Sequence, residues 1–334
     1  MLSGMSVGIW FCIIVGAVVL DRLIGDPAKI PHPIVYIGKL IGFLTKKLNK
    51  GKARKFKGLI LWCLTMLMTA VIVLGVQYLT YRINIILFLV VNLYFLATTI
   101  AARCLSEEVM KVCDALREKD LNKARLMVGY LVGRDTKNLD ENEIIRATIE
   151  TTAENTIDGV LAPIFFMMIG CFTWIFCPVL NPLTLAMLYK AVNTMDSMVG
   201  YVQEPYKDFG YFPAKIDDVV NFLIARIGSF FMLLGGFFLG YNMKEGSQIF
   251  FRDRKNHKSP NSAHPESVVA GLLGIQLGGT NQYFGEKLIK PTIGDSKNKL
   301  TAGHIKDTIE IMYTGEMTMM VVMIVIFFAI YFMG

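Results

Sequence analysis

Four charged side chains between residues 141 and 158 follow one another at helical spacing. They are separated by three, four and four positions: Glu143, Arg146, Glu150 and Glu154. Residues three or four apart share one face of a helix, so three carboxylates and one guanidinium form a single stripe. In water such a stripe is an ordinary ladder of ion pairs. Because an apolar segment begins at Gly159, where carboxylates are costly, Glu154 and Asp158 are better interpreted as facing a cavity or a metal ion.

A short turn before this helix carries three polar side chains in a row, Arg134, Asp135 and Thr136. A guanidinium can bind a phosphate or a carboxylate through two parallel hydrogen bonds. The alternative interpretation is structural, with Gly133 ending one helix and the next residues forming a solvated turn.

Near the N-terminus, prolines at positions 27, 31 and 33 interrupt the chain just after the first apolar run. Three prolines in seven residues exclude a continuous helix and predict a rigid turn. Such a turn can present Asp26 and His32 at the membrane surface, although a single histidine is more often structural than catalytic.

A further polar cluster combines the segment Asn-Thr-Met-Asp-Ser, which contains Asp196, with Tyr201 and the adjacent acids at 217 and 218. Adjacent acids before an apolar run suggest a divalent-cation site. Asp217 is also a plausible N-cap for the helix that follows. Inside that apolar run lies Arg226, for which an acid from one of the polar loops is the expected partner.

The stretch from Arg252 to Gly279 mixes basic, acidic, imidazole and glycine residues, among them His257 and Asn261. Glycines such as Gly278 permit close approach of the backbone to a phosphate or a flat ligand. No G-x-x-x-x-G-K-[ST] segment occurs in the sequence, so a nucleotide would have to bind without a P-loop.

The composition indicates what kind of elements must position these groups. The chain has 334 residues, of which 54% are hydrophobic and 18% charged, with a mean hydropathy of +0.48. A soluble fold of this size cannot bury so much apolar side chain, so a soluble single-domain enzyme and a disordered chain are both excluded. We attribute the formal charge of +7 to Lys and Arg at the anionic face of a membrane rather than to nucleic-acid binding.

The sequence predicts an all-α, polytopic membrane protein with five to six hydrophobic segments. A span needs about 20 mostly apolar residues, and five runs meet this requirement: about 4–20, 58–79, 83–101, 219–241 and 316–333. A sixth run, 159–192, is longer than one crossing and is interrupted by Pro163, Pro178 and Pro182. It is either one span with a partial insertion or a re-entrant hairpin.

Three polar lobes separate these segments, at 21–57, 102–158 and 242–315, and they carry ten, nine and ten Lys and Arg residues. By the positive-inside rule all three lobes are cytoplasmic. Six crossings would then place residues 193–218 outside, whereas a hairpin at 159–192 would return them to the cytoplasmic side. The sequence leaves these two arrangements open.

Helix signals in the lobe 102–158 predict membrane-associated cytoplasmic helices rather than a linker. Apolar residues between 105 and 116 recur at the spacing of an amphipathic helix. A second helix is predicted from the N-cap Asp120 to Gly133. A third is predicted from Asp140, whose capping box is completed by Glu143.

Five segments together resemble the CobD/CbiB family. In order, they are D-x-x-x-G-D-P-x-x-x-P-H-P-x-x-x-x-G at 21–38, G-R-D-T-x-x-L-D at 133–140, E-T-x-A-E-N-T-x-D-G-V-x-A-P at 150–163, K-A-V-N-T-x-D-S-M-V-G-Y at 190–201 and R-D-x-x-x-H-x-S-P-N-S at 252–262. The resemblance extends in order and spacing to about residue 285. Agreement over so much of the chain is far more specific than a match to one short motif.

The resemblance implies adenosylcobinamide-phosphate synthase activity, a late step of adenosylcobalamin (vitamin B12) biosynthesis in the cytoplasmic membrane. In that reaction adenosylcobyric acid is joined through a propionate carboxylate to aminopropanol phosphate, or to aminopropanol, with consumption of ATP and assistance by Mg²⁺. The expected partners are the corrinoid, the amine, the lipid bilayer and other late cobalamin-biosynthesis membrane enzymes, and not a nucleic acid.

Amide formation needs an activated carboxylate and a neutral amine, and we assign hypothetical roles on that basis. Catalysis is assigned to Glu150, Glu154, His257 and His32, with a histidine deprotonating the amine. The Mg²⁺ ligands are expected among Asp135, Glu150, Glu154 and Asp158. Substrate and phosphate binding is assigned to the remaining residues: Arg134, Thr136, Asn155, Asp196, Ser197, Tyr201, Arg252, Asn261, Gly278 and Gly279.

Two other classes of function remain as alternatives. A transporter or channel would fit several spans and Arg226, but it predicts inverted repeats, and none is visible in the sequence. A non-catalytic scaffold for corrinoid-assembly enzymes would fit degenerate motifs, but the motifs are intact here.

Overall fold

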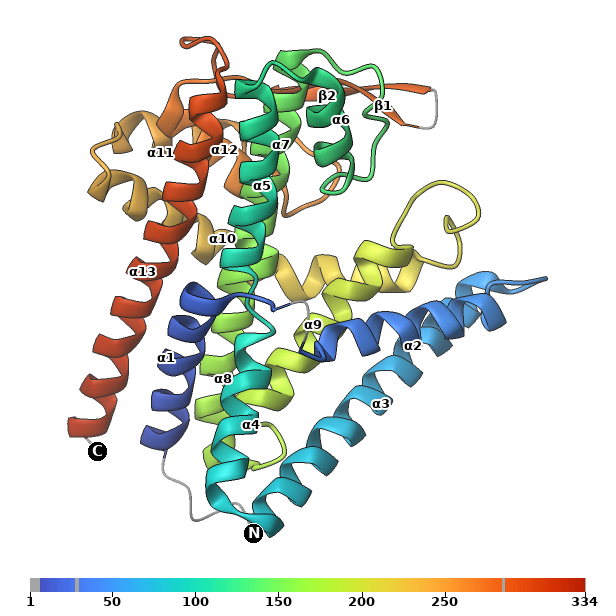
Figure 1. The fold of residues 1–334 in the computed structure, drawn as a ribbon, viewed down its shortest axis with the longest axis vertical. Helices are drawn as coiled ribbons and strands as arrows, with labels where there is room; N and C mark the ends of the chain where they lie inside the picture. The colour runs from blue at the N-terminus through green and yellow to red at the C-terminus, as the bar shows by residue number, and fades with distance from the viewer. Residues whose placement is uncertain (1–6, 28–29, 284–285, 334) are drawn as a thin grey trace. The chain divides into compact units, whose positions relative to one another are not determined.

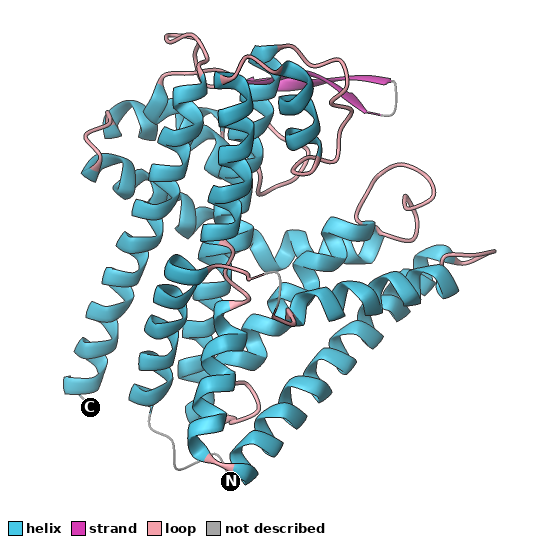
Figure 2. Ribbon diagram, viewed as in Figure 1, coloured by secondary structure: helices cyan, strands magenta, loops and turns pink. Residues whose placement is uncertain are grey.

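The computed structural model describes residues 7–27, 30–283 and 286–333, which form helices and one β-hairpin (Figure 2). In chain order the elements are α1 (Val7–Ile24), α2 (Pro33–Leu48), α3 (Arg54–Ile83), α4 (Ile85–Ala97), α5 (Ala102–Arg117), α6 (Leu121–Gly129), α7 (Glu141–Asn155), the π-helix η1 (Thr156–Leu161), α8 (Ala162–Phe176), α9 (Pro182–Val199), α10 (Tyr211–Phe238), α11 (Met243–Asp253), α12 (Ala263–Leu273), β1 (Leu277–Tyr283), β2 (Glu286–Ile293) and α13 (Ala302–Met333) (Figure 1). The predicted all-α class is confirmed, and the antiparallel pair β1 and β2 adds a small element that the sequence did not predict.

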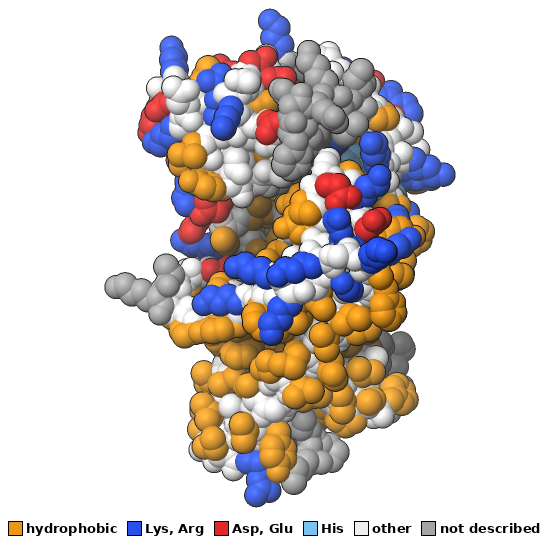
Figure 3. Space-filling view, turned by 90° about the vertical axis from the view of Figure 1, so that its right-hand side faces the viewer, with side chains coloured by type: hydrophobic (Ala, Val, Ile, Leu, Met, Phe, Trp, Pro, Cys, Tyr) orange, Lys and Arg blue, Asp and Glu red, His pale blue; other side chains and the backbone are white. Residues whose placement is uncertain are grey.

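Six helical runs are long and apolar enough to cross a membrane: Val7–Ile24, Arg54–Ile83, Ile85–Arg117, Glu141–Phe176, Tyr211–Phe238 and Ala302–Ala329. This finding confirms the predicted polytopic membrane protein. Residues 4–6 of the first predicted segment lie outside the described residues. Apolar side chains such as Leu67 and Val71 on α3 are more than half exposed, and Figure 3 shows hydrophobic side chains gathered into a broad band with Lys and Arg along one edge. Lipid tails are the solvent that such a surface requires.

The chain divides into two compact units. The first unit comprises Met1–Arg103 and Ala162–Asn221, and the second comprises Cys104–Leu161 and Phe222–Gly334. Each unit therefore combines segments that are far apart in the sequence.

Buried amide side chains connect helices of the first unit. Gln77 on α3 donates to Asn92 Oδ1 on α4 at 2.8 Å and to Asn181 Oδ1 at 3.0 Å. Asn181 Nδ2 donates back to Gln77 Oε1 at 3.0 Å, and Asn181 Oδ1 also caps α9 by accepting from Thr184 N at 3.0 Å. Amide pairs of this kind link helices in surroundings that offer no water.

Residues 159–192, for which the sequence left two arrangements open, form a helical hairpin in which α8 and α9 pack along each other (Figure 1). The two helices approach closely at Gly170, where a Cβ would lie 2.4 Å from Pro182 Cα. The Thr173 hydroxyl donates to the Leu180 carbonyl at 2.6 Å and so satisfies the turn between the helices.

Pro163 does not interrupt the helix, in contrast to the expectation from the sequence. The helical run continues from Glu141 to Phe176, and the π-helix η1 immediately precedes the proline. Proline lacks an N–H and its ring clashes with the carbonyl four residues earlier. A wider π turn moves that carbonyl away, which is how a proline is accommodated within a continuous helix.

The predicted helices of the lobe 102–158 are present in the second unit. Helix α5 buries Val109 and Val112, as its amphipathic pattern predicts. Helix α6 has the predicted N-cap Asp120 but ends at Gly129 rather than at Gly133. The backbone amides just after Gly129 donate to nearby carbonyls of the last helical turn. Helical hydrogen bonding therefore stops there, and the chain continues into the turn that contains Arg134.

Close helix packing completes the second unit. Helix α7 packs against α12, α13 and β1, and α11 packs against α12. A Cβ on Gly271 would lie 2.9 Å from Gly246 Cα, so glycines at both positions allow α11 and α12 to approach.

Candidate active site

Several polar groups of helix α7 form hydrogen bonds within the helix itself. Its N-terminus has the predicted capping box, in which Asp140 Oδ1 accepts from Glu143 N at 2.8 Å and Glu143 Oε2 accepts from Asp140 N at 2.9 Å. Three hydroxyls each donate to the carbonyl four residues earlier: those of Thr148 and Thr152 in α7 and that of Thr156 at the start of η1. Glu150 and Glu154, which lie one turn apart, interact instead with other elements.

Glu150 lies at the centre of a buried ion-pair network. Its Oε2 accepts from Arg134 Nη2 at 2.9 Å, and the two side chains are 8% and 5% exposed. Its Oε1 lies 3.8 Å from Arg146 Nε and accepts from the backbone amide of Gly278 at 2.9 Å. Arg134 therefore binds a carboxylate, as its residue type predicts, but that carboxylate belongs to this chain.

One turn further along α7, Glu154 meets two side chains from later in the sequence. One atom from each of Glu154, His257 and Glu266 lies within 4.8 Å of the other two. Glu266 is on α12 and is 3% exposed. Burial, together with the negative charges of Glu154 and Glu150, raises the pKa of Glu266 well above its usual value. The raised pKa favours the neutral acid, although the charge of Lys290 opposes this effect, and the neutral acid can donate a hydrogen bond to the Glu154 carboxylate.

His257 follows α11 and lies between a backbone amide and a lysine. Ser259 N donates to His257 Nδ1 at 3.0 Å, and His257 Nε2 lies 3.0 Å from Lys290 Nζ on β2. Burial is the largest influence on His257 and lowers its pKa, although the Glu154 carboxylate opposes this effect. The imidazole is therefore neutral near pH 7.

The donor set of this group does not suit Mg²⁺, which prefers oxygen ligands. One of the three groups is an imidazole whose Nε2 faces Lys290, and the two carboxyl groups share a proton. Asp135 and Asp158 are not in this group, which is the one set of three acidic, Cys or His side chains close enough to share an ion in the described part of the chain. We therefore interpret Glu154, His257, Glu266 and Lys290 as an acid–base cluster.

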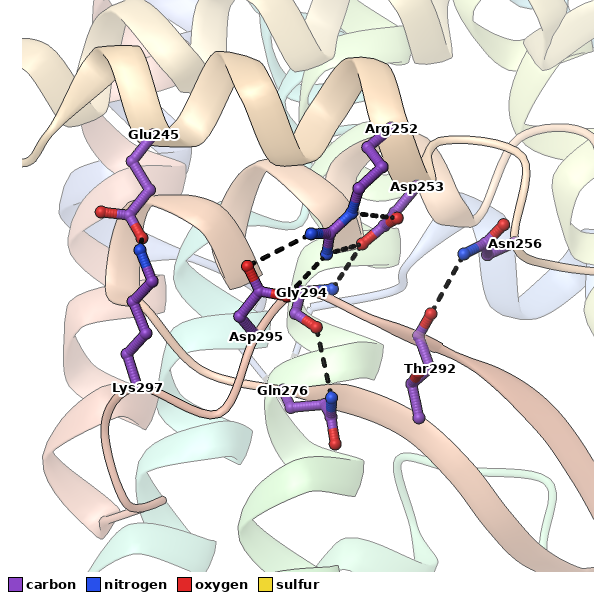
Figure 4. Close-up of polar contacts among 9 residues, drawn as sticks. All are labelled: Glu245, Arg252, Asp253, Asn256, Gln276, Thr292, Gly294, Asp295 and Lys297. Atoms are coloured by element: carbon purple, nitrogen blue, oxygen red, sulfur yellow. Dashed lines mark hydrogen bonds and ion pairs between the residues drawn. The ribbon is translucent and has the colours of Figure 1, made fainter.

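An arginine clamp fixes the end of the hairpin (Figure 4). Asp253, the last residue of α11, accepts from Arg252 Nη2 and Nε at 2.8 Å each and from the backbone amide of Gly294 at 2.7 Å. Arg252 also donates to the two oxygens of Asp295, at 2.9 and 3.2 Å. The Arg252 guanidinium lowers the pKa of Asp253. Arg252, which the sequence assigned to substrate phosphate, thus binds two carboxylates of its own chain.

The glycine pair Gly278 and Gly279 belongs to a β-bulge. The pairing register shifts between them, and Pro291 is the extra residue on β2. Their φ values of 76° and 81° are in the left-handed region that favours glycine, and a Cβ on Gly278 would lie 2.3 Å from Pro291 O. Because proline has no N–H, a strand accepts it at a bulge. The bulge sets the direction of the adjacent Lys290, which faces His257.

The other predicted residues of the second unit make local contacts. Asn155, the last residue of α7, donates to a carbonyl one turn earlier at 2.9 Å. Thr136 lies against Gly129 at the end of α6. Asn261 is 8% exposed, and its Oδ1 accepts from Arg226 Nη1 at 3.4 Å. Residues 135 and 158 lie in the turn after α6 and in η1, respectively.

Arg226 lacks the acidic partner that the sequence predicted, as far as the described residues show. Its guanidinium lies 3.4 Å from the centroid of the Phe222 ring and donates to the Phe222 carbonyl and to Asn261. A carbonyl, an amide oxygen and an aromatic face can together stabilise a cation without a carboxylate.

Four of the predicted site residues belong to the first unit. His32 precedes α2, and its Nε2 lies 3.0 Å from Asp26 Oδ1. These two side chains line a cavity of about 610 Å³ with Tyr36 and Lys39. The other three are on α9 or just after it: Asp196, Ser197 and Tyr201.

These three residues make contacts close to the end of α9. Ser197 Oγ donates to the carbonyl one turn earlier at 3.0 Å, and the Tyr201 ring lies 6.0 Å from the ring of Tyr206. The carboxylate of Asp196 occupies the space beside Gly200, where a Cβ would lie only 2.0 Å from Oδ1. A Cβ at position 200 would also lie 2.7 Å from the Asp196 backbone carbonyl oxygen, which favours glycine there.

Asp217 takes part in a buried amide network in the same unit. Its Oδ2 accepts from Asn221 Nδ2 at 3.0 Å, and Asn221 Oδ1 accepts from the Tyr189 hydroxyl at 2.9 Å. Asn193 also hydrogen-bonds to Asp217. Helix α10 begins at Tyr211, so Asp217 lies inside the helix and the predicted N-cap role is wrong.

A polar cavity of about 540 Å³ lies at the N-terminal end of α7 in the second unit. Its wall carries two positive side chains, Arg146 and Lys299, and two negative ones, Asp140 and Glu143. Amide side chains complete the polar lining. Arg146 also donates to the Thr280 carbonyl at 2.8 Å, so this cavity borders the network around Glu150.

Glu266 and Lys290 are the residues of the acid–base cluster that reasoning from the sequence did not assign. Glu266 stands two residues after His264, in a stretch already noted for its mixed charges, and its high burial as an acid is the property that marks it. Lys290 has no comparable local signal, because its direction depends on the bulge at Pro291.

The chain was compared with known proteins. A family model described as CobD/Cbib protein matches residues 14–312. A protein named cobalamin biosynthesis protein CobD from Listeria monocytogenes serotype 4b (strain F2365) is 47% identical over 301 residues, which cover 89% of this chain and 92% of the relative. Proteins of the same name from Clostridium acetobutylicum and Geobacter metallireducens are 44% and 43% identical, covering 94% and 91% of this chain and 97% and 92% of their own lengths. No solved structure matches the chain.

Proposed function

The chain belongs to the CobD/CbiB family and acts in cobalamin biosynthesis, and we propose that it catalyses the amide-forming step. Adenosylcobyric acid is the proposed acid, and aminopropanol phosphate or aminopropanol is the proposed amine. ATP is the proposed activating reagent, accompanied by Mg²⁺. The cytoplasmic membrane is the proposed location, and its other late cobalamin-biosynthesis enzymes are proposed partners.

The observation that carries this proposal is the acid–base cluster. Joining a carboxylate to an amine requires attack of the carboxylate on the terminal phosphate of ATP, release of ADP, and attack of a neutral amine on the acyl phosphate. The second step releases phosphate and a proton. Two carboxyl groups, an imidazole and a lysine side chain within one group, of which Glu266 is buried and the others half-buried, are suited to moving that proton.

We assign Glu154 to binding the substrate ammonium. Its carboxylate accepts a hydrogen from Glu266, which fixes its orientation and leaves its remaining lone pairs for a donor. An ammonium held by this carboxylate would lie within the same group as His257 and Lys290. Such positioning converts the encounter of amine and acyl phosphate into a step between bound groups.

Glu150 and Arg134 are assigned supporting roles rather than contacts with substrate. Their buried ion pair holds the turn before α7, and the Gly278 amide holds β1 against the same carboxylate. For a substrate phosphate we propose the 540 Å³ cavity, where Arg146 and Lys299 offer positive charge and the acids that also line it, Asp140 and Glu143, are engaged in the capping box. Because Mg²⁺ in phosphate-transfer sites is usually held by one or two carboxylates together with substrate phosphates, we propose that the ion arrives bound to ATP phosphates.

The proposal is tested with the purified chain in detergent, incubated with adenosylcobyric acid, aminopropanol phosphate, ATP and Mg²⁺. We expect a corrinoid product whose mass equals the sum of acid and amine less one water, formed together with equimolar ADP and phosphate. The same incubation without ATP should give no product. Hydrolysis of ATP without any corrinoid product would contradict the assignment to amide formation.

A further inference from the structure

Two arginines of the second unit, Arg226 on α10 and Arg254 at the end of α11, form no ion pair with any acid that the structure describes. Arg226 hydrogen-bonds through Nη1 alone, to the Phe222 carbonyl and to Asn261 Oδ1. Arg254 Cζ lies 4.9 Å from the centroid of the Phe251 ring, and its buried Nη1 has no acceptor among the described residues. Both guanidiniums therefore keep a full positive charge that the chain does not neutralise.

Contacts through Asn261, His264 and Phe250 bring the two arginines to one place. The Asn261 side chain accepts from Arg226, and its backbone carbonyl accepts from His264 N at 3.0 Å. The His264 ring meets the edge of the Phe250 ring with the centroids 5.8 Å apart, and the Phe250 centroid lies 5.6 Å from Arg254 Cζ. The two guanidiniums are close enough for their positive charges to repel each other.

His264 provides a second polar group without a partner at this place. The residue is 2% exposed, and its Nδ1 makes no hydrogen bond to the described residues. Burial, together with the positive charges of Arg226 and Arg254, lowers the pKa of His264 to about 4, so the imidazole is neutral near pH 7. Polar groups are seldom buried in this way without a partner, because the loss of water is then uncompensated.

The charge of the arginine pair suits a phosphate group. A guanidinium binds phosphate oxygens through two parallel hydrogen bonds, and a phosphate monoester carries a charge of about −1.5 to −2 near pH 7. Arg252, by contrast, is already surrounded by the carboxylates of Asp253 and Asp295 (Figure 4). The rings of Phe222 and Phe251 are more than half exposed, so an apolar surface borders the two cations. A phosphate attached to an apolar or flat group would use both features.

We propose that Arg226 and Arg254 form a binding site for the phosphate group of a larger molecule. In this site Arg254 donates through Nη1, and Arg226 donates through Nη2 and Nε, which make no hydrogen bond to the described residues. Two classes of molecule offer the required chemistry: a nucleoside triphosphate and a phospholipid with an anionic headgroup. The site is separate from the 540 Å³ cavity, whose lining includes neither arginine.

The test measures binding to the purified full chain in detergent, without corrinoid or amine, so its outcome does not depend on the proposed reaction. One arm titrates the protein with ATP and Mg²⁺ by calorimetry. The other arm measures retention of phosphatidylglycerol relative to phosphatidylcholine by native mass spectrometry. For Arg226→Gln and Arg254→Gln we expect binding to weaken by about 10–100-fold in one arm, because a charge-assisted hydrogen bond is lost. Weakening in the ATP arm identifies the nucleotide, and weakening in the phosphatidylglycerol arm identifies the lipid.

Two further variants make the result specific. Lys255→Gln removes the same charge from the exposed neighbour of Arg254 and should bind as the wild type in both arms. Arg254→Lys keeps the charge but loses the planar pair of donors, so it should weaken binding by a smaller factor than Arg254→Gln. Unfolding midpoints establish that each variant is folded, and Arg254→Lys carries the test if the glutamine variants are not.

Three outcomes would overturn the site. They are a wild-type protein that binds neither ATP nor phosphatidylglycerol in preference to phosphatidylcholine, wild-type affinity in the folded arginine variants, and an equal loss of binding in Lys255→Gln. None of them changes the expected yield of corrinoid product from the wild type, so the amide-forming function is judged by its own assay.

Discussion

The acid–base cluster of the second unit and the amide network of the first unit surround their acids differently: Glu154 is half-buried in the cluster, and Asp217 is buried in the network. In the cluster, Glu154 is surrounded by a carboxylic acid, an imidazole and a lysine. In the network, Asp217 is held by the neutral amides of Asn193 and Asn221. Both acids lie on helices with membrane-spanning composition, where an isolated charge is costly.

The difference indicates which region can change its protonation during a reaction. The amide partners of Asp217, Asn193 and Asn221, neither gain nor lose protons, whereas the carboxylates of Asp196 and Asp218 also act on Asp217. The acid–base cluster contains three kinds of titratable group in mutual contact, whose protons can be redistributed. We therefore propose that the chemistry takes place in the second unit and that the amide network of the first unit has a structural role.

The largest expected effect is on the cluster. Glu154→Gln keeps the shape of the side chain but removes the charge that is proposed to bind the substrate ammonium. We expect the rate of amide formation to fall by about 10²–10⁴-fold while the protein still extracts and elutes as a folded species in detergent. The measurement is corrinoid product by mass against time. Full activity of this variant would remove α7 from the mechanism.

The next effect is on stability rather than chemistry. Glu150→Gln leaves the buried Arg134 guanidinium without its carboxylate, and we expect a loss of about 3–5 kcal/mol of folding free energy. The readout is the unfolding midpoint in detergent. The double variant Arg134→Met with Glu150→Gln should lose less than the sum of the single variants, because it removes both charges. An additive result would show that the two side chains do not act as a pair.

A smaller effect is expected at the clamp that holds β2. Asp253→Ala removes the acceptor of the buried Gly294 amide and should cost about 1–3 kcal/mol. Because the pKa of Asp253 is lowered in the folded chain, its stabilisation is present above the unfolded pKa of about 3.9 and is lost as the pH falls through the lowered value. The difference in the free energy of unfolding between wild type and variant should therefore be largest at pH 7 and become smaller below about pH 4.

The matched control for this prediction is Asp295→Ala. Asp295 pairs with the same arginine but is 45% exposed, so its removal should cost less than about 1 kcal/mol. Unfolding midpoints measured at pH 7, 5 and 3.5 compare the two variants directly. Equal losses for both would mean that the Gly294 contact does not stabilise the hairpin.

The smallest effect is expected in the amide network. Asp217→Asn keeps an oxygen that can accept from Asn221, so amide formation should change by less than about tenfold, or about 1.4 kcal/mol in the barrier. The same product assay used for Glu154→Gln measures it. A loss of amide formation as large as that of Glu154→Gln would contradict the distinction between the two regions and would indicate that Asp217 takes part in the reaction.

Local sequence patterns predicted part of the candidate active site. The spacing of Glu150 and Glu154 put both on one face of α7, and the capping box at Asp140 and Glu143 is present as predicted. The sequence predicted that Arg252 binds an anion. It did not predict that the anions are the carboxylates of Asp253 and Asp295. A guanidinium suits a substrate phosphate and a protein carboxylate equally well, so residue type alone does not distinguish them.

Two features of the helices could not be predicted from short stretches of sequence. The helix was expected to break at Pro163, but η1 accommodates it, and the end of α6 falls four residues before the predicted glycine. Both differences come from turns whose hydrogen bonds shift by one position, which composition does not reveal.

The sequence by itself determined that the chain requires a lipid environment, where α6 and α7 start, and that acids line one face of α7. Hydropathy, capping and the 3.6-residue period act over a few neighbouring residues. The tertiary structure alone decided that Gly278 meets Glu150 across 128 positions and Lys290 meets His257 across 33. Those contacts depend on the register of a hairpin and on the close packing of α11 with α12, which are properties of the assembled backbone and not of any segment read separately.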